Sequence, residues 1–222
     1  MTTRILIADD HPLMRKAIRY TLEQEPDFNV VGEAEDGEQV VTLAEKLLPD
    51  LIIMDITMPK LSGLEATRKI KDRSPNIAVL VLTVHDDTEH IHAMLKVGVA
   101  GYLTKKILDD DLVNAIRATI SGEVVIAAPI FHEVLNYAPN ELPKPNIYDI
   151  KNQLNNRELE ILKLAANGVG NRNIALKLNL SPNTVKNYLV EIFSKLNVAS
   201  RTEAVVVALR LGLLEMHDIY YI

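Results

Sequence analysis

Residues 51–55 read Leu51-Ile52-Ile53-Met54-Asp55, and this stretch decides the fold class of the 222-residue chain. A short apolar run that stops at a polar residue is typical of a strand covered on both faces of a parallel sheet. Other short apolar runs lead to polar side chains in the same way. They are Ile5–Ala8 before Asp9 and Asp10, Ala78–Leu82 before Thr83, and Tyr102–Leu103 shortly before Lys105.

Helix-like segments alternate with the strand-like ones through residue 121, with short connections between them. This alternation predicts five βα units, that is, an α/β fold with a doubly wound, five-stranded parallel sheet. The expected strands are 5–8, 28–34, 51–54, 77–82 and 101–103, and the expected helices are 12–24, 37–47, 63–72, 88–96 and 109–120.

The polar residues after the strands should meet at one edge of this sheet. In an open α/β sheet the ligand crevice lies beyond the carboxyl ends of the strands. Bare carboxylates repel one another at close range, so the cluster favours a divalent cation with oxygen ligands, and Mg²⁺ is the natural candidate. A carboxylate can also attack phosphorus, with a metal and a lysine neutralising charge on the transferred oxygens. The set Asp9, Asp10, Asp55, Thr83 and Lys105 therefore indicates phosphorylation of an aspartate.

Taken singly, these residues have simpler interpretations. Asp9 and Asp10 could cap the helix expected near Pro12, which is a common role for aspartate. Thr83 could be a strand-end hydroxyl without a task, and Lys105 a solvated loop residue. Their shared position after the strands favours the common site.

The composition narrows the classes of function. The chain has no cysteine, no run of eighteen apolar residues and no pattern of a secretory leader, so we expect a cytoplasmic protein. Its net charge of −6 is uneven, since residues 1–147 carry 15 basic and 23 acidic residues whereas 148–222 carry 9 and 7. The locally positive carboxy-terminal part permits weak binding to nucleic acid phosphates, and a second copy would strengthen it.

The helical periodicity fades between about residues 123 and 153, where four prolines break up any long helix. We expect an interdomain linker there, which divides the chain into a domain at 1–122, a linker at 123–150 and a second domain at 151–216. The prolines are Pro129, Pro139, Pro143 and Pro145.

The second domain shows only helical segments, at 156–167, 171–178, 182–196 and 202–211. Asn155 with Glu158 forms a capping-box pattern, and Ser181 followed by Pro182 marks another helix start. The spacing of 171–178 and 182–196 is that of a helix-turn-helix, whose second helix enters the major groove of DNA.

Helical periodicity turns one face of segment 182–196 toward the domain core and leaves the other for DNA. On the outer face Lys186 could contact guanine or phosphate, Asn187 could pair with adenine, and Val190 could touch a thymine methyl group. Tyr188 and Lys195 are better placed for the DNA backbone. The full set of predicted DNA-binding residues is Asn183, Thr184, Lys186, Asn187, Tyr188, Val190 and Lys195.

The last helical segment, 202–211, is too apolar to be solvated with only one face packed. We expect it to pair with its twin in a homodimer through Val205, Val206 and Leu209. Twofold pairing would set two recognition helices about one DNA turn apart, on two half-sites.

The whole chain resembles two-component response regulators of the NarL/FixJ (LuxR-type) family. The matching stretches are Ile5–Pro12, Asp50–Pro59 with Gly63, Thr83, Gly101–Lys105 and Asn155–Thr202. The resemblance implies a flavodoxin-like receiver domain followed by a smaller, all-α helix-turn-helix domain. It also implies a cognate histidine kinase as partner.

The resemblance further implies a role for each residue of the site. Asp55 would be the phosphoacceptor, and Thr83 and Lys105 would hold the phosphoryl oxygens. Thr83 and Tyr102 would form the switch that changes the surface near the fourth and fifth strands. Mg²⁺ would be bound by Asp9, Asp10, Asp55 and the backbone carbonyl of Thr57.

Three hypotheses of function follow. The first is a transcriptional regulator in which phosphorylation of Asp55 switches dimerisation and DNA binding; it is not an enzyme in the metabolic sense, because it turns over once per signal. The second is a DNA-binding regulator independent of phosphate, with the receiver as a dimerisation scaffold. The third is an aspartate-nucleophile phosphohydrolase, whose Asp-x-Asp pattern is broken here by Asp55-Ile56-Thr57.

Overall fold

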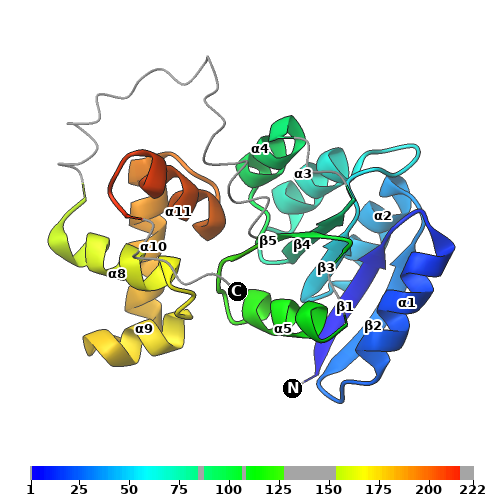
Figure 1. Cartoon of the computed structure of the whole chain (residues 1–222), viewed down its shortest axis with the longest axis horizontal. Coiled ribbons are helices and arrows are strands. Elements are labelled where there is room, and N and C mark those ends of the chain that lie inside the picture. The colour runs from blue at the N-terminus through cyan, green and yellow to red at the C-terminus, as the bar shows by residue number, and fades with distance from the viewer. Residues whose placement is uncertain (1, 85–87, 107–108, 128–153, 216–222) are drawn as a thin grey trace.

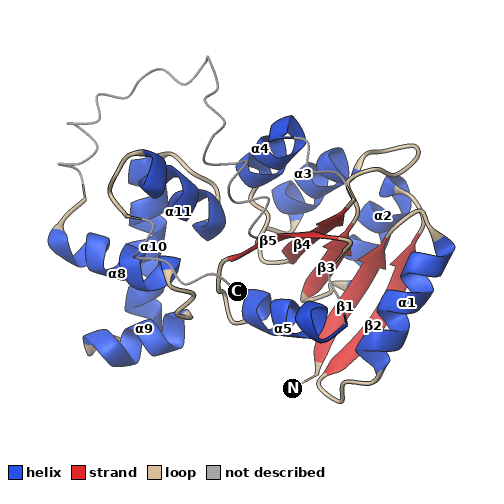
Figure 2. Cartoon of the chain, in the orientation of Figure 1, coloured by secondary structure: helices blue, strands red, loops and turns tan. Residues whose placement is uncertain are grey.

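The computed structural model describes residues 2–84, 88–106, 109–127 and 154–215. Its first part is a parallel sheet with helices on both faces, and its second part is a group of helices (Figures 1 and 2). The strand order is β2-β1-β3-β4-β5-β6. The strands are β1 Thr3–Ala8, β2 Phe28–Ala34, β3 Leu51–Met54, β4 Ala78–Thr83, β5 Gly101–Thr104 and β6 Val125–Ile126.

Side chains of alternate strand residues point to opposite faces of the sheet, and each face has its own apolar core. Leu6 and Ile52 belong to the core beneath α2 (Gly37–Leu47), α3 (Gly63–Arg73) and α4 (Thr88–Val97). Ile5 and Ile53 belong to the core beneath α1 (Pro12–Glu23) and α5 (Asp109–Ile120). Burial on both faces explains why these strands read as continuous apolar runs.

The sheet has six strands and not the five that the sequence predicted. The sixth, β6, pairs in parallel with β5, and Ala127 donates a backbone hydrogen bond of 3.0 Å to the Tyr102 carbonyl. Val125 and Ile126 thus belong to the sheet, whereas the sequence predicts a linker from residue 123. A two-residue strand has no periodicity of its own, and the open edge of β5 determines its pairing. The four linker prolines lie outside the described residues.

The second domain contains four helices among its described residues 154–215, as predicted; two have the predicted bounds, the first ends one residue earlier, and the last lies one residue earlier at both ends. Asn155 and Glu158 form the expected capping box, and the Ser181 side chain accepts a hydrogen bond from the Thr184 amide. Asn197 ends the third helix in a left-handed conformation, with φ 53°. The helices are α8 Asn156–Ala166, α9 Asn171–Leu178, α10 Pro182–Leu196 and α11 Arg201–Arg210.

Helix α11 packs against the sheet domain beside α4 (Figure 1). The Thr202 hydroxyl donates to the Ala100 carbonyl at 2.8 Å, and Arg210 Nη2 lies 2.8 Å from His92 Nε2. Val206 is only 2% exposed and joins the apolar core beneath α2, α3 and α4. The two domains are therefore docked through α11.

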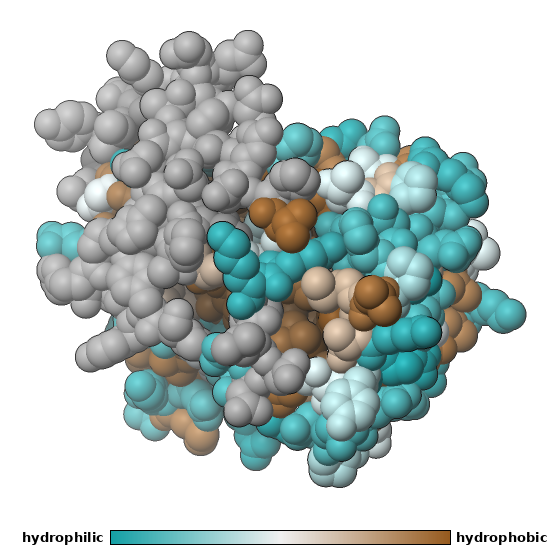
Figure 3. Space-filling model, turned by 45° about the vertical axis from the view of Figure 1, so that its right-hand side comes forward, coloured by the Kyte–Doolittle hydropathy of each residue, from teal (hydrophilic) through white to brown (hydrophobic). Residues whose placement is uncertain are grey.

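On the face shown in Figure 3, hydrophobic side chains form small patches among hydrophilic ones. Within the described part of the chain, no helix combines the length and apolar character needed to cross a bilayer.

Candidate functional site

Three of the predicted site residues form a compact, buried cluster at the carboxyl edge of the sheet. Lys105 Nζ lies 2.6 Å from Asp9 Oδ2 and 2.7 Å from Asp55 Oδ2. The side chains of Asp9 and Asp55 are each 3% exposed, and that of Lys105 is 5% exposed. The ammonium thus bridges two carboxylates that would otherwise repel each other.

The sheet register brings these residues together. Ala8 pairs with Met54, and Thr83 pairs with Thr104, so the residues that follow β1, β3 and β5 leave the sheet at one level. The Asp55 amide donates to the Ala8 carbonyl at 2.8 Å, and the Lys105 amide donates to the Thr83 carbonyl at 2.7 Å. The site lies where the strand order turns from β1 toward β2 on one side and β3 on the other, which is the usual ligand position in such sheets.

The cluster has unusual proton affinities. Burial raises the pKa of Asp55, and the Asp9 charge adds to this, while Lys105 and a backbone hydrogen bond from Thr57 oppose it. Burial by itself would lower the pKa of Lys105, but its hydrogen bonds to Asp55 and Asp9 outweigh burial and raise it. The site therefore pairs a lysine whose pKa is raised with a carboxylate whose pKa is also raised, so added positive charge would favour the ionised form of Asp55.

The residues fit a divalent cation. Ligand atoms from Asp9, Asp10, His11 and Asp55 all lie within 4.8 Å of one another. Asp55 Oδ1 is buried and has no hydrogen-bond partner among the described residues, so an oxygen ligand is left for a cation. His11, to which the sequence assigned no role, places Nδ1 2.6 Å from Asp10 Oδ1. Its side chain is 71% exposed, so it lies at the rim.

Thr57, Thr83 and Tyr102 lie around this cluster. Thr57 is exposed on the loop that follows β3, and its amide donates to Asp55. Thr83 is buried at the end of β4, and Tyr102 is fully buried on the side of the sheet that carries α4. Their ligand and switch roles stay predictions.

Helix α10 presents most of its predicted DNA-binding residues to solvent. Asn183, Lys186 and Asn187 are exposed, and Val190 is 59% exposed although it is apolar. Docking of α11 therefore leaves the outer face of α10 open. Thr184, also on the predicted list, has its amide and hydroxyl engaged with the Ser181 side chain.

Two predicted backbone contacts have other partners. Lys195 Nζ lies 2.6 and 2.7 Å from the carboxylate oxygens of Glu158, which is 1% exposed. Tyr188 packs against the core of the helical domain. Lys195 already neutralises a buried charge, and the contacts of Lys195 and Tyr188 with the DNA backbone stay predictions.

The predicted dimerisation surface is not a free surface. Val205 lies in the core of its own domain, Val206 is buried against the sheet domain, and Leu209 is partly buried in the helical core. The apolar character of this helix is explained within one chain, because α11 is covered on both sides. A contact of Val205 with a twin would require repacking of this core, and pairing through Val206 would require undocking, so both stay predictions.

Arg201 was missed by sequence reasoning. Its guanidinium donates to the carbonyls of Gly122 and, at 2.6 Å, Val169, and lies 3.2 Å from Asn171 Oδ1. Burial lowers the pKa of Arg201 to about 10, although Glu123 opposes this. The sequence held no signal for this contact, because its acceptors are backbone carbonyls of distant turns.

Comparison with known proteins agrees with both parts of the structure. The family model described as response regulator receiver domain matches residues 5–117, and the one described as bacterial regulatory proteins, luxR family, matches residues 152–208. The transcriptional regulatory protein DegU of Brevibacillus brevis is 38% identical over 221 residues, covering 94% of each chain.

Solved structures show the same likeness. The response regulator ChrA of a heme-sensing two-component system is 33% identical, with a TM-score of 0.52, over 96% of this chain and 99% of that one. The structure of two RcsB dimers bound to two parallel DNAs is 26% identical, with a TM-score of 0.58, over 97% and 100%. These matches confirm the predicted resemblance and the two-domain architecture.

Proposed function

The chain belongs to the two-component response regulators that join a receiver to a LuxR-type DNA-binding domain, and we propose that phosphorylation of Asp55 is its control step. The observation that carries the proposal is the Asp55 carboxylate itself. It is buried at the end of β3, held by Lys105 through Oδ2, and left without a described partner at Oδ1.

In the proposed reaction an oxygen of Asp55 attacks the phosphorus of a phosphohistidine on the partner kinase. The new bond joins oxygen to phosphorus, the bond from phosphorus to histidine nitrogen breaks, and the imidazole leaves. Lys105 balances the negative charge of the phosphoryl oxygens, and the Thr83 hydroxyl donates a hydrogen bond to one of these oxygens. Asp9, Asp10, Asp55 and the Thr57 carbonyl would hold Mg²⁺, which when bound supplies positive charge beside the phosphoryl oxygens.

Phosphorylation of Asp55 would act on the docking of α11 against the sheet domain. Thr83 and Tyr102 lie on β4 and β5, and α11 docks beside these strands through Ala100 and α4. We infer that phosphorylation favours release of α11, which frees Val206 for pairing of two chains. One phosphorylation per signal makes the protein a switch and not a metabolic enzyme.

The released dimer would bind two half-sites in the major groove, in the cytoplasm. Asn183, Lys186, Asn187 and Val190 are the proposed base-reading residues, because they are exposed on one face of α10. The solved structure of two RcsB dimers bound to two parallel DNAs supports a dimer on DNA.

The test is the intact mass of the protein after incubation with a small acyl phosphate, with and without Mg²⁺. One phosphoryl group should appear on the wild type in Mg²⁺ and not on Asp55→Asn. Asp111→Asn, which changes an exposed carboxylate, serves as the control and should be modified normally. DNA binding by the same samples should tighten with modification. Unchanged DNA binding without any adduct would instead support the phosphorylation-independent regulator.

A further inference from the structure

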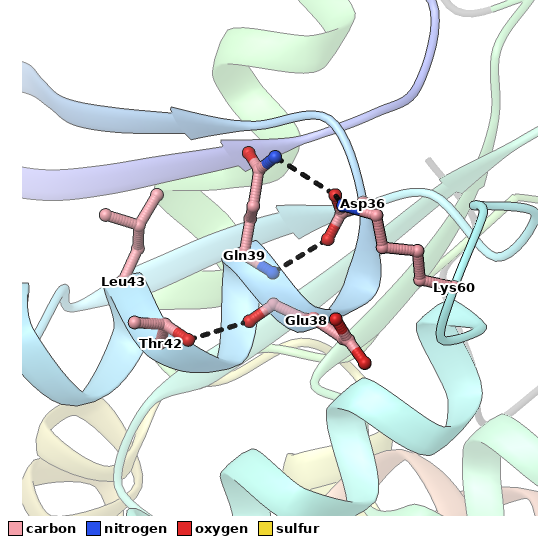
Figure 4. A pocket seen from close by; sticks show the side chains of 6 residues that line it. All are labelled: Asp36, Glu38, Gln39, Thr42, Leu43 and Lys60. Carbon is pink, nitrogen blue, oxygen red and sulfur yellow. Dashed lines mark hydrogen bonds and ion pairs between the residues drawn. The ribbon is translucent and has the colours of Figure 1, made fainter.

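A second ion pair lies near the proposed phosphorylation site, between Asp36 and Lys60 (Figure 4). Asp36 caps the start of α2, and its carboxylate is 2% exposed. It accepts hydrogen bonds from the Gln39 amide at 2.8 Å, from Gln39 Nε2 at 3.0 Å and from Lys60 Nζ at 2.6 Å. Lys60 comes from the loop after β3, so the pair joins two loops at the carboxyl edge of the sheet.

The backbone of Lys60 is in the left-handed region, with φ 64°. This conformation is unfavourable for a residue with a side chain and persists only where the surroundings hold it. The lysine side chain is 56% exposed, so its own pairing contributes little to global stability. The left-handed backbone of Lys60 and its short contact with the buried Asp36 carboxylate therefore indicate a role in local loop structure and not in global stability.

Close backbone contacts connect the same two loops. A Cβ atom on Gly37 would lie 2.0 Å from the Leu61 carbonyl oxygen, so only glycine fits there. The Gly37 amide lies 3.5 Å from the Pro59 carbonyl oxygen, which is a weak hydrogen bond at best. Lys60 is the residue between these two contact points, and its ammonium makes the shortest hydrogen bond to Asp36, at 2.6 Å.

The loop held in this way begins at the proposed phosphoacceptor. It runs from Asp55 through Thr57 to the start of α3, and the Gly63 amide closes it by donating to the Ile56 carbonyl at 2.8 Å. On the other side of the pair is an open hollow of about 390 Å³, lined by Glu38, Gln39, Thr42 and Leu43 as well as the pair. The hollow gives the middle of the loop room to move if the pair is lost.

We propose that Lys60 and Asp36 are positioning residues that fix this loop, so that the Thr57 carbonyl is in place before a cation binds. The inference rests on the proposed function, because it assigns Thr57 to the cation. A loop that is already ordered loses less conformational entropy on binding, so the pair should strengthen cation binding without touching the cation.

The experiment uses the full chain and four variants. Lys60→Met keeps the apolar stem and removes the charge, Lys60→Arg restores a charge, and Asp36→Asn keeps a helix cap. Arg73→Met is the matched control, because Arg73 and Glu45 form another exposed ion pair between α2 and α3. We would measure amide hydrogen exchange of residues 56–61 without metal, and the dissociation constant of Mg²⁺ by calorimetry.

Lys60→Met and Asp36→Asn should speed exchange in the loop and weaken Mg²⁺ binding roughly tenfold. Lys60→Arg should recover most of both losses, and Arg73→Met should change neither. The proposal would be overturned if Lys60→Met kept the wild-type rate of loop exchange and the wild-type Mg²⁺ affinity. It would also be overturned if Arg73→Met changed both quantities as much as Lys60→Met does. If the wild type bound no Mg²⁺, the proposed function would fail instead, while exchange in metal-free protein would still report whether the pair orders the loop.

Discussion

At the scale of the residue, the ammonium of Lys105 supplies positive charge to two buried carboxylates, those of Asp9 and Asp55. Lys105→Met would leave Asp9 and Asp55 facing each other without a positive charge. We expect the metal-free protein to lose about 3 kcal/mol of unfolding free energy, since breaking a buried ion pair leaves an uncompensated charge. Mg²⁺ should restore more stability to this variant than to the wild type. Urea unfolding with and without Mg²⁺ measures both effects.

The neighbouring exposed residue provides the control for this substitution. Lys106→Met should leave both the stability and its Mg²⁺ dependence unchanged, since the side chain of Lys106 is exposed. Equal Mg²⁺ effects in Lys105→Met and in the wild type would show that the carboxylates do not hold the cation.

Lys71 provides a pH-dependent test of a buried charge. Burial lowers its pKa from 10.5 to about 8, and its ammonium donates to the Ile77 carbonyl at 2.8 Å. From pH 8 to about 10.5 the unfolded chain retains a proton that the folded chain loses, so rising pH favours folding in this window. Relative to Lys71→Met, the wild type should gain about 1 kcal/mol between pH 7 and pH 9. A difference that does not change with pH would contradict the lowered pKa.

The sequence predicted the main site residues because their positions follow from one rule. Asp9, Asp10, Asp55 and Lys105 each follow a strand, and parallel strands bring such residues to one edge. Pairings set by tertiary distance could not be predicted. Lys195 meets Glu158 across 37 positions, and Asp36 meets Lys60 across 24. Neither spacing follows a helical or strand period, so no local pattern indicates them.

At the scale of the element, α10 carries two lysines with different roles. Lys195 pairs with the buried Glu158, whereas Lys186 is exposed on the face proposed to contact DNA. Lys195→Ala should lower the unfolding free energy by about 1 kcal/mol, because Glu158 loses its partner, while partial hydration of the lysine limits the loss. Its effect on the salt dependence of DNA binding should be small. Thermal unfolding and DNA titrations at several salt concentrations measure the two quantities.

Lys186→Ala should behave in the opposite way, because Lys186 is exposed on the outer face of α10. We expect unchanged stability and a salt slope of DNA binding lower by about 1, as for a lost phosphate contact, or a lost preference for guanine if it reads a base. A lower salt slope in Lys195→Ala together with an unchanged slope in Lys186→Ala would instead assign the phosphate contact to Lys195.

Elements with strong periodicity were predicted closely from the sequence. The continuous apolar runs predicted β3 with its observed bounds, β4 to within one residue and β1 two residues short at its start. The caps at Asn155 and Ser181 predicted the starts of α8 and α10. The role of α11 was not predictable in the same way. An apolar helix needs cover, but its sequence does not say whether a second chain or the domain of its own chain provides it.

At the scale of the whole molecule, the docked state depends on contacts between α4 and α11. His92 Nε2 lies 2.8 Å from Arg210 Nη2, so His92→Arg would bring two guanidinium groups together. We expect this variant to undock, with a larger radius of gyration in X-ray scattering and tighter DNA binding without phosphorylation. His92→Asp should pair with Arg210 and make DNA binding depend more strongly on phosphorylation.

The two substitutions act in opposite directions at one position, so a general loss of stability cannot mimic both. Unfolding by urea should be monitored in parallel to confirm that each variant remains folded. If His92→Arg kept the wild-type radius and phosphate dependence, the contact between α4 and α11 would not control access to the dimer.

Strand β6 also determines the residue at which a receiver fragment should end and at which it can be fused to another domain. A receiver fragment that ends at Gly122 would expose β5 as an open edge, and open edges recruit strands from other molecules. A fragment that ends at Ala127 would carry its own short edge strand. In hybrid regulators built by exchanging receivers, a junction after Ala127 should give soluble monomers, whereas a junction at Gly122 should give aggregates in light scattering.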